Sequence, residues 1–516
     1  MKKRLLCLLL CCALFPFSAL AENVEDSLLL GMVSVHTTEI RPLEPKERDI
    51  VSLYGMVYES LVTIDDNGIP QPLLAENWTE NGGGQTWTFT LRENITFSDG
   101  TPLTANDVVA SCQYILDLAK NKELEDNGFY QNIKFMVASI KAPDERTVIV
   151  KAERSYYGLL YAMTFPVVPA TQVAQSNPVG TGPYVIKSFE AGTLMWLVAN
   201  EKWWQTQPQV KEIMASFFPS NKQMITAFEY GRVDAAVTRS VAAAQYKSGI
   251  NSLSINYSTR QLETLLMNHQ IFPLGSLKVR QAIRYAINVD KIAQNVYMGM
   301  TIKADTPVPS GSWMYYDQES SFVYNPDRAR ELLAEEGWSL LDNDNVLDLP
   351  VEGAPEPKHL VLQLCVYEDP ENDVRYETAY MIRDMLAEVG ISVKVTEMPY
   401  ADVKAKLEAG SFELAVCSFQ TDVVPDYGFI LRKGNPQNYC RYVSSEMTSL
   451  IDTLRTNQEQ TDFAYTQQAI QQQFAADVPF ICLFYRSGAI LTRKMFTTVR
   501  SIREFELLRG IEAFGR

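Results

Sequence analysis

Residues 86–108 read TWTFTLRENITFSDGTPLTANDV, and they predict a strand, a turn and a helix in succession. Residues 86–91 alternate β-branched side chains with aromatic or aliphatic ones, a pattern typical of a strand. The sequence NGGG at 81–84 precedes this strand and predicts a turn, so we expect a hairpin there. Asp99-Gly100 predicts the turn that leads to the helix.

The predicted helix begins after Thr104, whose hydroxyl can accept a hydrogen bond from the first helical N–H groups. Asp107 follows three residues later, so the two residues form a short capping box. The spacing of apolar residues predicts one buried stripe, formed by Val108, Val109, Cys112, Ile115 and Leu116.

Further helices follow the same logic. Residues 279–287 place apolar side chains at helical spacing, and we expect the polar residues between them to point outward, namely Lys278, Arg280, Gln281 and Arg284. Asn325-Pro326-Asp327 predicts a helix start and Gly337 its end, with Ala329, Leu332 and Leu333 facing inward. A helix over 381–389 precedes an alternating strand at 391–395. Alternating strands and helices indicate mixed α/β domains.

Composition narrows the function classes. The chain has 516 residues, of which 46% are hydrophobic and 21% are charged, as in soluble globular proteins of two or three domains. Its formal net charge of −16 argues against nucleic-acid binding, because an acidic surface repels phosphates. Beyond the N-terminus no run of 18 apolar residues occurs, so the sequence does not predict a permease.

The N-terminus predicts export. Lys2, Lys3 and Arg4 precede an apolar stretch at 5–17, and Ala19-Leu20-Ala21 predicts signal-peptidase cleavage before Glu22. A membrane anchor is a poorer fit because the apolar stretch is short. Lipidation at Cys11 or Cys12 is also less favoured, because the preceding residue would not be small. We expect an exported protein, periplasmic or associated with the cell surface.

The reactive residue types show no catalytic or metal pattern. Five cysteines remain after the predicted signal, at wide spacing and without a Cys-x-x-Cys motif; they are Cys112, Cys365, Cys417, Cys440 and Cys482. We expect small buried side chains rather than a disulfide framework. The three histidines form no metal-binding motif, and no G-x-S-x-G elbow occurs. The sequence predicts no cofactor, no metal and no enzymatic activity.

The block at 86–108 resembles the F-x-L-R…F-x-D-G-x-P-x-T-A-x-D-V element of the dipeptide/oligopeptide-binding proteins of ABC transporters, the extracellular solute-binding protein family 5. Other blocks resemble the same family in order along nearly the whole chain: YESLV at 58–62, PLLAENW at 72–78, VGTGPY at 179–184, NEKWW at 200–204, GRVD at 231–234, VRQAIRYAI at 279–287 and YNP…LL…GW at 324–338.

The resemblance implies an α/β, two-lobed periplasmic-binding-protein-like fold of type II, in the large variant with an extra subdomain in lobe one. The expected parts are a signal peptide at 1–21, the lobe-one core at 22–66, 180–264 and 482–516, the extra subdomain at 67–179, and lobe two at 265–481. The chain would cross between lobes near 263–268 and return near 479–484.

The resemblance also implies a function. A monomeric receptor would capture an oligopeptide or similar small solute between its lobes and deliver it to a membrane permease driven by ATPase subunits. An oligosaccharide or a metal chelate in the same fold is the first alternative, since relatives differ in ligand. A secreted hydrolase using paired carboxylates is the alternative from another class.

Asp422 is the first candidate ligand residue. It lies in SFQTDVVPDY at 418–427, and peptide-binding relatives carry W-x-x-D-Y-x-x-P in the comparable loop, where the Asp pairs with the peptide's α-amino group. Here Phe419 stands in place of the Trp and Val423 in place of the Tyr. We expect Phe419 to contact the ligand as well. A shifted register would promote Asp426 instead.

Glu39, Ile40 and Arg41 are the second candidates, because relatives place this stretch against the ligand backbone. Arg41 would clamp a ligand carboxylate, or else form a surface ion pair. Tyr439, and with less weight Tyr442 near Asn438, would form the lobe-two wall or pack internally. Trp203-Trp204 is expected in core contacts. Gly180 and Gly182 are expected at positions of positive φ or close backbone approach, not in a phosphate cradle.

Overall fold

The computed structural model describes residues 27–81, 83–121, 129–246, 252–317, 323–368, 374–493 and 502–510. The predicted signal peptide at 1–21, with Cys11 and Cys12, lies outside these residues. Gly82 of the predicted turn is outside them as well.

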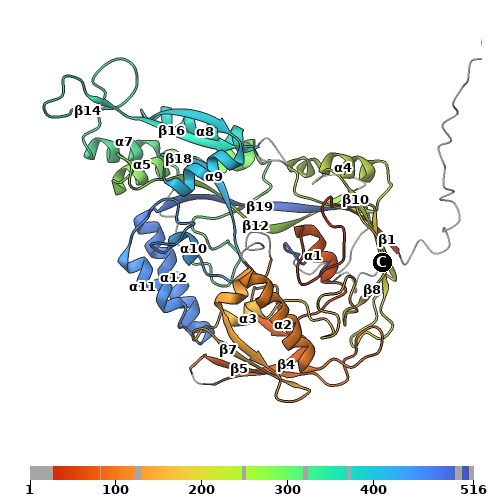
Figure 1. Cartoon of the computed structure of the whole chain (residues 1–516). Coiled ribbons are helices and arrows are strands. Elements are labelled where there is room, and N and C mark those ends of the chain that lie inside the picture. The colour runs from red at the N-terminus through yellow and green to blue at the C-terminus, as the bar shows by residue number, and fades with distance from the viewer. Residues whose placement is uncertain are drawn as a thin grey trace, which may run out of the picture.

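One large mixed sheet runs through the described chain (Figure 1). Its eleven strands are β17 (Ser392–Met398), β16 (Val361–Tyr367), β18 (Leu414–Gln420), β12 (Leu253–Met267), β19 (Phe480–Thr492), β11 (Ala235–Thr238), β1 (Ser27–Val33), β10 (Glu212–Phe218), β9 (Leu194–Ala199) and β8 (Tyr184–Glu190) in that order, with β13 (Thr301–Lys303) paired to β19. β1 is parallel to β10 and β11, and β16 is parallel to β17 and β18.

The long strands β12 and β19 join the two halves of this sheet. They pair antiparallel from Leu253↔Thr492 to Leu266↔Phe480, and all thirteen residues of β19 are buried. In Figure 1 they cross the molecule between the α5, α7, α8 and α9 group and the α4, β10 and β1 group. The lobe boundaries proposed above remain a prediction.

A second sheet confirms the predicted hairpin. β4 (Ala75–Asn81) pairs antiparallel with β5 (Thr86–Leu91), and β7 (Thr147–Ala152) and β6 (Val137–Lys141) extend the sheet. Trp87, Phe89 and Leu91 of β5 are buried while the residues between them are partly exposed, as the alternation predicts. Small two-stranded sheets are formed by β2 (Val62–Ile64) with β3 (Pro70–Pro72), and by β14 (Asp348–Leu349) with β15 (Lys358–His359).

Helix α2 (Ala105–Lys120) begins as predicted. The backbone N–H of Thr104 donates a 2.8 Å hydrogen bond to Asp107, and the capping box is complete. Four of the five residues of the predicted stripe are buried, but Val109 is only partly buried. Ser111 is buried in the stripe because its hydroxyl donates to the carbonyl of Val168, which satisfies its polarity.

The predicted outward face of α5 (Leu277–Ala286) is wrong at two positions. Arg280 is 6% exposed and Arg284 is 7% exposed. The Arg280 guanidinium donates to the carbonyl groups of Leu274, Gly275, Asp477 and Val478, and Arg284 pairs with Asp305 at 3.3 Å. A buried guanidinium is tolerated where carbonyl and carboxylate acceptors surround it. The spacing of apolar residues along a helix cannot predict such acceptors.

The remaining helices cover the sheets. α7 (Pro326–Glu335) is capped by Asn325, which accepts from the N–H of Arg328 at 3.0 Å, and α8 (Val374–Ala387) ends before Gly390, as predicted. The others are α1 (Arg48–Tyr54), α3 (Leu159–Ala162), α4 (Asn221–Glu229), α6 (Val289–Asn295), α9 (Tyr400–Ala409), α10 (Gly428–Leu431), α11 (Ser445–Leu454), α12 (Gln460–Asp477) and the 3₁₀ turns η1 (Gln131–Phe135) and η2 (Val241–Tyr246).

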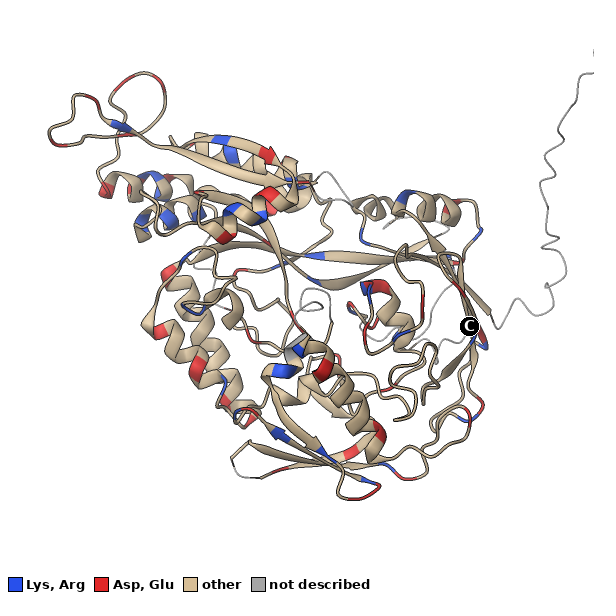
Figure 2. Cartoon of the chain, viewed as in Figure 1, with Lys and Arg blue, Asp and Glu red and all other residues tan. Residues whose placement is uncertain are grey.

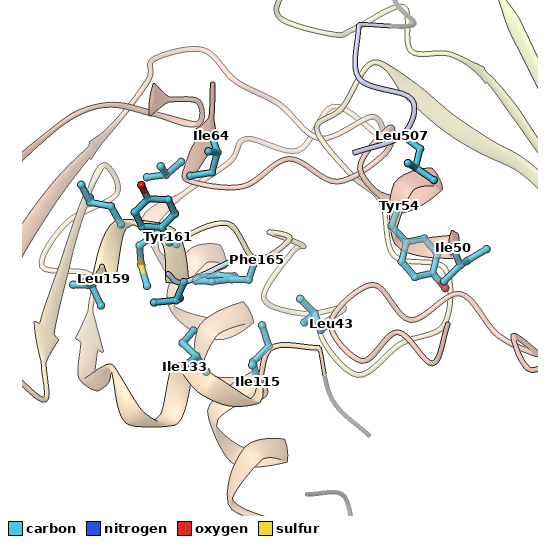
Figure 3. Close-up of a cluster of buried hydrophobic side chains, with 14 of the residues drawn as sticks. Leu43, Ile50, Tyr54, Ile64, Ile115, Ile133, Leu159, Tyr161, Phe165 and Leu507 are labelled. Carbon is cyan, nitrogen blue, oxygen red and sulfur yellow. The ribbon is translucent and has the colours of Figure 1, made fainter. Parts of the chain in front are cut away.

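Separate hydrophobic clusters support the two ends of the sheet. One gathers α5, α7, α8 and the strands β16–β18 around residues such as Ile283, Leu333 and Ile382. The largest cluster joins α1 and α2 with the second sheet and with α11–α12. Figure 3 shows part of it, in which Leu507 near the C-terminus lies by Tyr54 and Ile50 of α1. The five cysteines outside the predicted signal are free and buried, as expected.

Residues 155–163 contact α11–α12 across the molecule. The N–H of Tyr157 donates to the carbonyl of Asn457 at 2.7 Å, and the Tyr157 ring lies 5.6 Å from that of Phe463. We call this contact the Tyr157–Phe463 contact. It ties the segment after the second sheet to a helix that precedes β19.

Gly180 and Gly182 confirm the close-approach alternative. A Cβ at Gly180 would overlap the carbonyl oxygen of Val57, and one at Gly182 would crowd the Met56 and Val57 backbone. Neither glycine has a positive φ. The turn therefore needs glycine for packing against residues 56–57.

The surface mixes both charge signs. Figure 2 shows acidic and basic residues interspersed on the same helices, for example on α7, where Arg330 pairs with Asp327 and Arg328 with Glu331.

Among the described residues, no helix combines the length and the apolar content needed to cross a membrane.

Candidate functional site

A cavity of about 660 Å³ lies where distant parts of the chain meet. Its walls come from α1 and residues 58–64, from residues around Tyr161, from the loop after β18, and from residues 503–510. This volume is in the range of small-molecule sites, about 300–1,000 Å³. Polar and charged side chains line it together with aromatic ones, so it can hold a solute with both polar ends and apolar groups.

Asp422 lines this cavity, as do its neighbours Gln420, Thr421, Val423 and Val424. The N–H of Thr421 donates to the carbonyl of Arg260 at 2.9 Å, which anchors the loop to β12. Asp422 Oδ1 accepts from the N–H of Val423 at 2.5 Å. A carboxylate so fixed at a cavity wall can accept a hydrogen bond from an ammonium group.

The structure separates Asp422 from the register alternative Asp426. Asp426 pairs with Arg455 at 2.6 Å and accepts from the N–H of Gly428 at 2.8 Å. It is not among the residues that line the cavity. Asp426 therefore holds its own loop against α11, and of the two aspartates Asp422 is the one that lines the cavity.

Phe419 and Tyr439 lie together but away from the cavity lining. Their rings are stacked at 6.1 Å with an interplanar angle of 15°, and Phe419 also contacts Phe480. Tyr442 and Asn438 are buried, and the Asn438 amide donates to the Tyr442 carbonyl at 2.8 Å. These contacts support a role in internal packing for all four residues.

Glu39, Ile40 and Arg41 also lie outside the cavity lining. Arg41 pairs with Glu39 at 2.7 Å and with Glu44 at 3.0 Å, and these carboxylates raise its pKa. Ile40 is 1% exposed. The structure thus does not bring this stretch to Asp422.

Sequence reasoning missed Glu59, which lines the cavity and is 6% exposed. Its carboxylate accepts from the indole Nε1 of Trp203 at 3.2 Å and of Trp204 at 2.9 Å. Burial raises the pKa of Glu59 to about 7. The sequence held a signal, because Glu59 is the one charged residue in MVYESLV at 56–62 and Trp203-Trp204 offers two indole donors.

The C-terminal segment was also missed as a wall of the cavity. Glu504 is 3% exposed, forms an ion pair with Arg48, and accepts from the backbone N–H of Arg260 at 2.6 Å. Arg503 donates to the carbonyl groups of Ile64 and Asp65. Nothing in the local sequence at 503–510 distinguishes these residues from an exposed charged tail.

A second cavity of about 350 Å³ lies by Phe272 and Trp338, far along the chain from Asp422. Within the described ranges, no group of three or more His, Cys, Asp or Glu side chains is placed to hold a metal ion.

Comparisons with known proteins agree with this architecture. The family model described as "Bacterial extracellular solute-binding proteins, family 5 Middle" matches residues 70–439. A probable D,D-dipeptide-binding periplasmic protein of Escherichia coli is 24% identical over 82% of this chain and 80% of the relative. A nickel-binding periplasmic protein of the same species is 27% identical over 66% of each chain.

Solved structures show the same fold. The oligopeptide-binding protein of Bacillus subtilis, solved with a nonapeptide, superposes with a TM-score of 0.68 at 20% identity, covering 95% of this chain and 98% of that one. The mixed α/β, two-lobed fold of type II periplasmic binding proteins, expected from the sequence, is thereby confirmed.

Proposed function

Since the chain belongs to the bacterial extracellular solute-binding proteins of family 5, we propose that it captures a peptide between its two lobes and delivers it to a membrane permease. In this family the binding protein serves an ABC importer, whose ATPase subunits drive the permease. The relatives bind and transport solutes rather than convert them, and this chain would do the same.

One observation carries the peptide assignment. Asp422 lines the cavity, its carboxylate accepts a hydrogen bond from the N–H of Val423, and the neighbouring Thr421 bonds the loop to β12. An ammonium group on the solute would form a charge-assisted hydrogen bond to it. A peptide's α-amino group has this charge and can approach from the cavity.

We also propose that the protein is exported across the cytoplasmic membrane. The relatives named above are periplasmic proteins, and the sequence at 1–21 has the pattern of a cleaved signal. We propose that the mature protein is a monomer beginning at Glu22.

Mass spectrometry after incubation tests the proposal. The purified protein is mixed with a defined peptide library, washed, denatured, and its ligands are identified. We expect intact peptides with free amino termini. Shortened peptides would instead indicate a hydrolase, and a protein that retains no peptide would refute the proposal.

A metal chelate is the second candidate, favoured by the 27% identity to the nickel-binding relative. Elemental analysis of the same washed protein, loaded with nickel and free histidine as a probe, tests it. Retained nickel without retained peptide would favour the chelate over the peptide.

Asp422→Asn sharpens the peptide test. The variant should lose affinity for peptides with a free amino group by about 30-fold or more and should bind N-acetylated peptides as the wild type does. Asp402→Asn, an exposed carboxylate in the first turn of α9, is the matched control. Equal loss for both peptide forms would show that Asp422 acts on the fold and not on the ligand.

A further inference from the structure

The indole of Trp313 joins parts of the chain that are far apart in sequence. Its Nε1 donates to the hydroxyl oxygen of Tyr161 at 3.1 Å and to the carbonyl oxygen of Gly68 at 3.2 Å. The Tyr161 hydroxyl in turn donates to the same Gly68 carbonyl at 2.8 Å. The three groups therefore form a closed set of hydrogen bonds between residues up to 245 positions apart.

The turn between β2 and β3 fits Trp313 closely. Gly68 lies in this turn with a φ of 86°, which side chains other than glycine rarely adopt. A Cβ at this position would lie 3.4 Å from Cδ1 of Trp313. The backbone N–H of Trp313 also donates to the carbonyl of Asn67 at 3.4 Å. The turn thus contacts both the ring and the main chain of Trp313.

Helix α12 fixes the segment that carries Trp313. Gln471 of this helix is fully buried, and its amide donates to the carbonyl of Met314 at 2.8 Å. The same side chain accepts from the N–H of Tyr316 at 3.1 Å. Because these bonds hold the residues on either side of position 315, the main chain next to Trp313 moves with α12.

The contact crosses the boundary between the lobes that the sequence predicts. In that division Trp313 and α12 belong to lobe two, whereas Gly68 and Tyr161 belong to the extra subdomain of lobe one. Rings from both sides surround the indole, with Phe463 of α12 at 6.3 Å and Tyr157 at 6.4 Å between ring centres. Separation of the lobes would break the hydrogen bonds and part these rings.

Tyr161 relates this contact to the solute. It is 3% exposed, lines the cavity, and is labelled in Figure 3 among the buried side chains. Its hydroxyl is held by Gly68 and Trp313, and a buried polar group is costly to move away from its partners. A solute that packs against the Tyr161 ring therefore meets a surface whose orientation is fixed partly from lobe two.

We propose that Trp313 is a positioning residue, which fixes Tyr161 in the cavity wall from lobe two and so holds the lobes closed over the solute. The effect on solute release rests on the proposed peptide function, whereas the effect on closure rests on the contact alone. The hydrogen bonds of Trp313 must break before the lobes can separate. Their loss should therefore speed dissociation of the solute more than it slows association.

Stopped-flow measurements with the dipeptide Ala-Phe test the effect on release. Trp313→Phe keeps an aromatic ring but removes the indole donor. This variant should release Ala-Phe about 5- to 10-fold faster than the wild type, the loss expected for one hydrogen bond, with the association rate changed by less than about twofold. Trp78→Phe, at a partly buried tryptophan of β4, is the matched control and should leave both rates unchanged. Equal release rates for Trp313→Phe and the wild type would refute the proposal.

A double-mutant cycle tests whether Trp313 acts through Tyr161. Tyr161→Phe removes the hydroxyl that accepts from the indole, so the two substitutions remove the same hydrogen bond. The double variant should release Ala-Phe more slowly than the product of the two single effects predicts. Effects that multiply in full would show that the residues act independently, and the positioning role would be refuted.

Two further measurements separate the possible failures. Thermal melts of the solute-free variants report folding, and a lower melting temperature with an unchanged release rate would show a merely structural role and refute the proposal. If the wild type binds neither Ala-Phe nor any library peptide, the peptide function fails and small-angle scattering of the solute-free proteins decides on closure. Trp313→Phe should then have a larger radius of gyration than the wild type, and equal radii would refute the role in closure.

Discussion

The indole Nε1 of Trp204 donates a 2.9 Å hydrogen bond to Glu59, a carboxylate that is 6% exposed beside the cavity. The buried Glu59 has a pKa of about 7, against an ordinary value of 4.5. Between these values the unfolded chain loses its proton and the folded chain keeps it. Glu59 therefore favours the folded state fully below pH 4.5, and this contribution is lost as the pH rises to about 7.

Glu59→Gln should remove this pH dependence. We expect the wild type to lose on the order of 3 kcal/mol more unfolding free energy than the variant between pH 4.5 and 7.5. His269 acts in the opposite direction, because burial lowers its pKa to about 4, so only the difference between the two proteins is informative. Urea unfolding across this range measures it, and parallel curves would contradict the assignment.

Breaking the buried pair of Glu263 and Arg375 should destabilise the fold strongly. Their side chains are 1% and 3% exposed and lie 3.2 Å apart. Glu263→Gln removes the Glu263 carboxylate from beside the buried Arg375 charge, and we expect a loss of about 3–5 kcal/mol in urea unfolding. Arg328→Gln breaks the exposed pair with Glu331 and should cost less than about 1 kcal/mol. Similar losses for both variants would show that burial does not decide the cost.

Gly180→Ala should disrupt the turn after the second sheet. The added methyl group would overlap the Val57 carbonyl, and relief requires movement of backbone, so we expect a loss of about 3 kcal/mol or more. Gly55→Ala is the control, since its φ of −60° suits alanine and an added Cβ would lie 3.6 Å from the carbonyl oxygen of Ser52. Guanidinium unfolding compares the two. A Gly180→Ala protein as stable as the control would contradict the close packing.

The cysteine thiols should not react with a thiol reagent until the chain unfolds. All five cysteines outside the predicted signal are free and buried, so Ellman's reagent should react with none in the native protein within minutes. In urea it should titrate five per chain if residues 1–21 have been removed. A count of eight would show a retained signal, and a count below five would reveal a disulfide.

Local signals were enough for much of the fold. Thr104 with Asp107, Asn325 with Pro326, and the alternation at 86–91 depend only on neighbours in sequence, and each element formed as predicted. The predicted outward orientation of Arg280 and Arg284 was wrong because their hydrogen-bond acceptors come from residues up to 198 positions away. Helical spacing cannot report such partners.

The candidate site shows the same difference between residues that a local motif predicts and residues that only the fold brings together. Asp422 was identified through a loop that resembles a known motif, and it does line the cavity, although its ligand role stays a prediction. The place of Arg260 and Glu504 in the cavity wall could not be predicted from sequence, because the two residues meet there from positions 244 residues apart. Glu39, Ile40, Arg41, Phe419 and Tyr439 remain predictions that lie apart from this cavity.

The Tyr157–Phe463 contact has a consequence for how long a solute stays. Tyr157 and Phe463 fall in different lobes of the division predicted from the sequence, so we expect this contact to break when the lobes separate. On that prediction, a weaker contact would release the solute sooner and shorten its residence time.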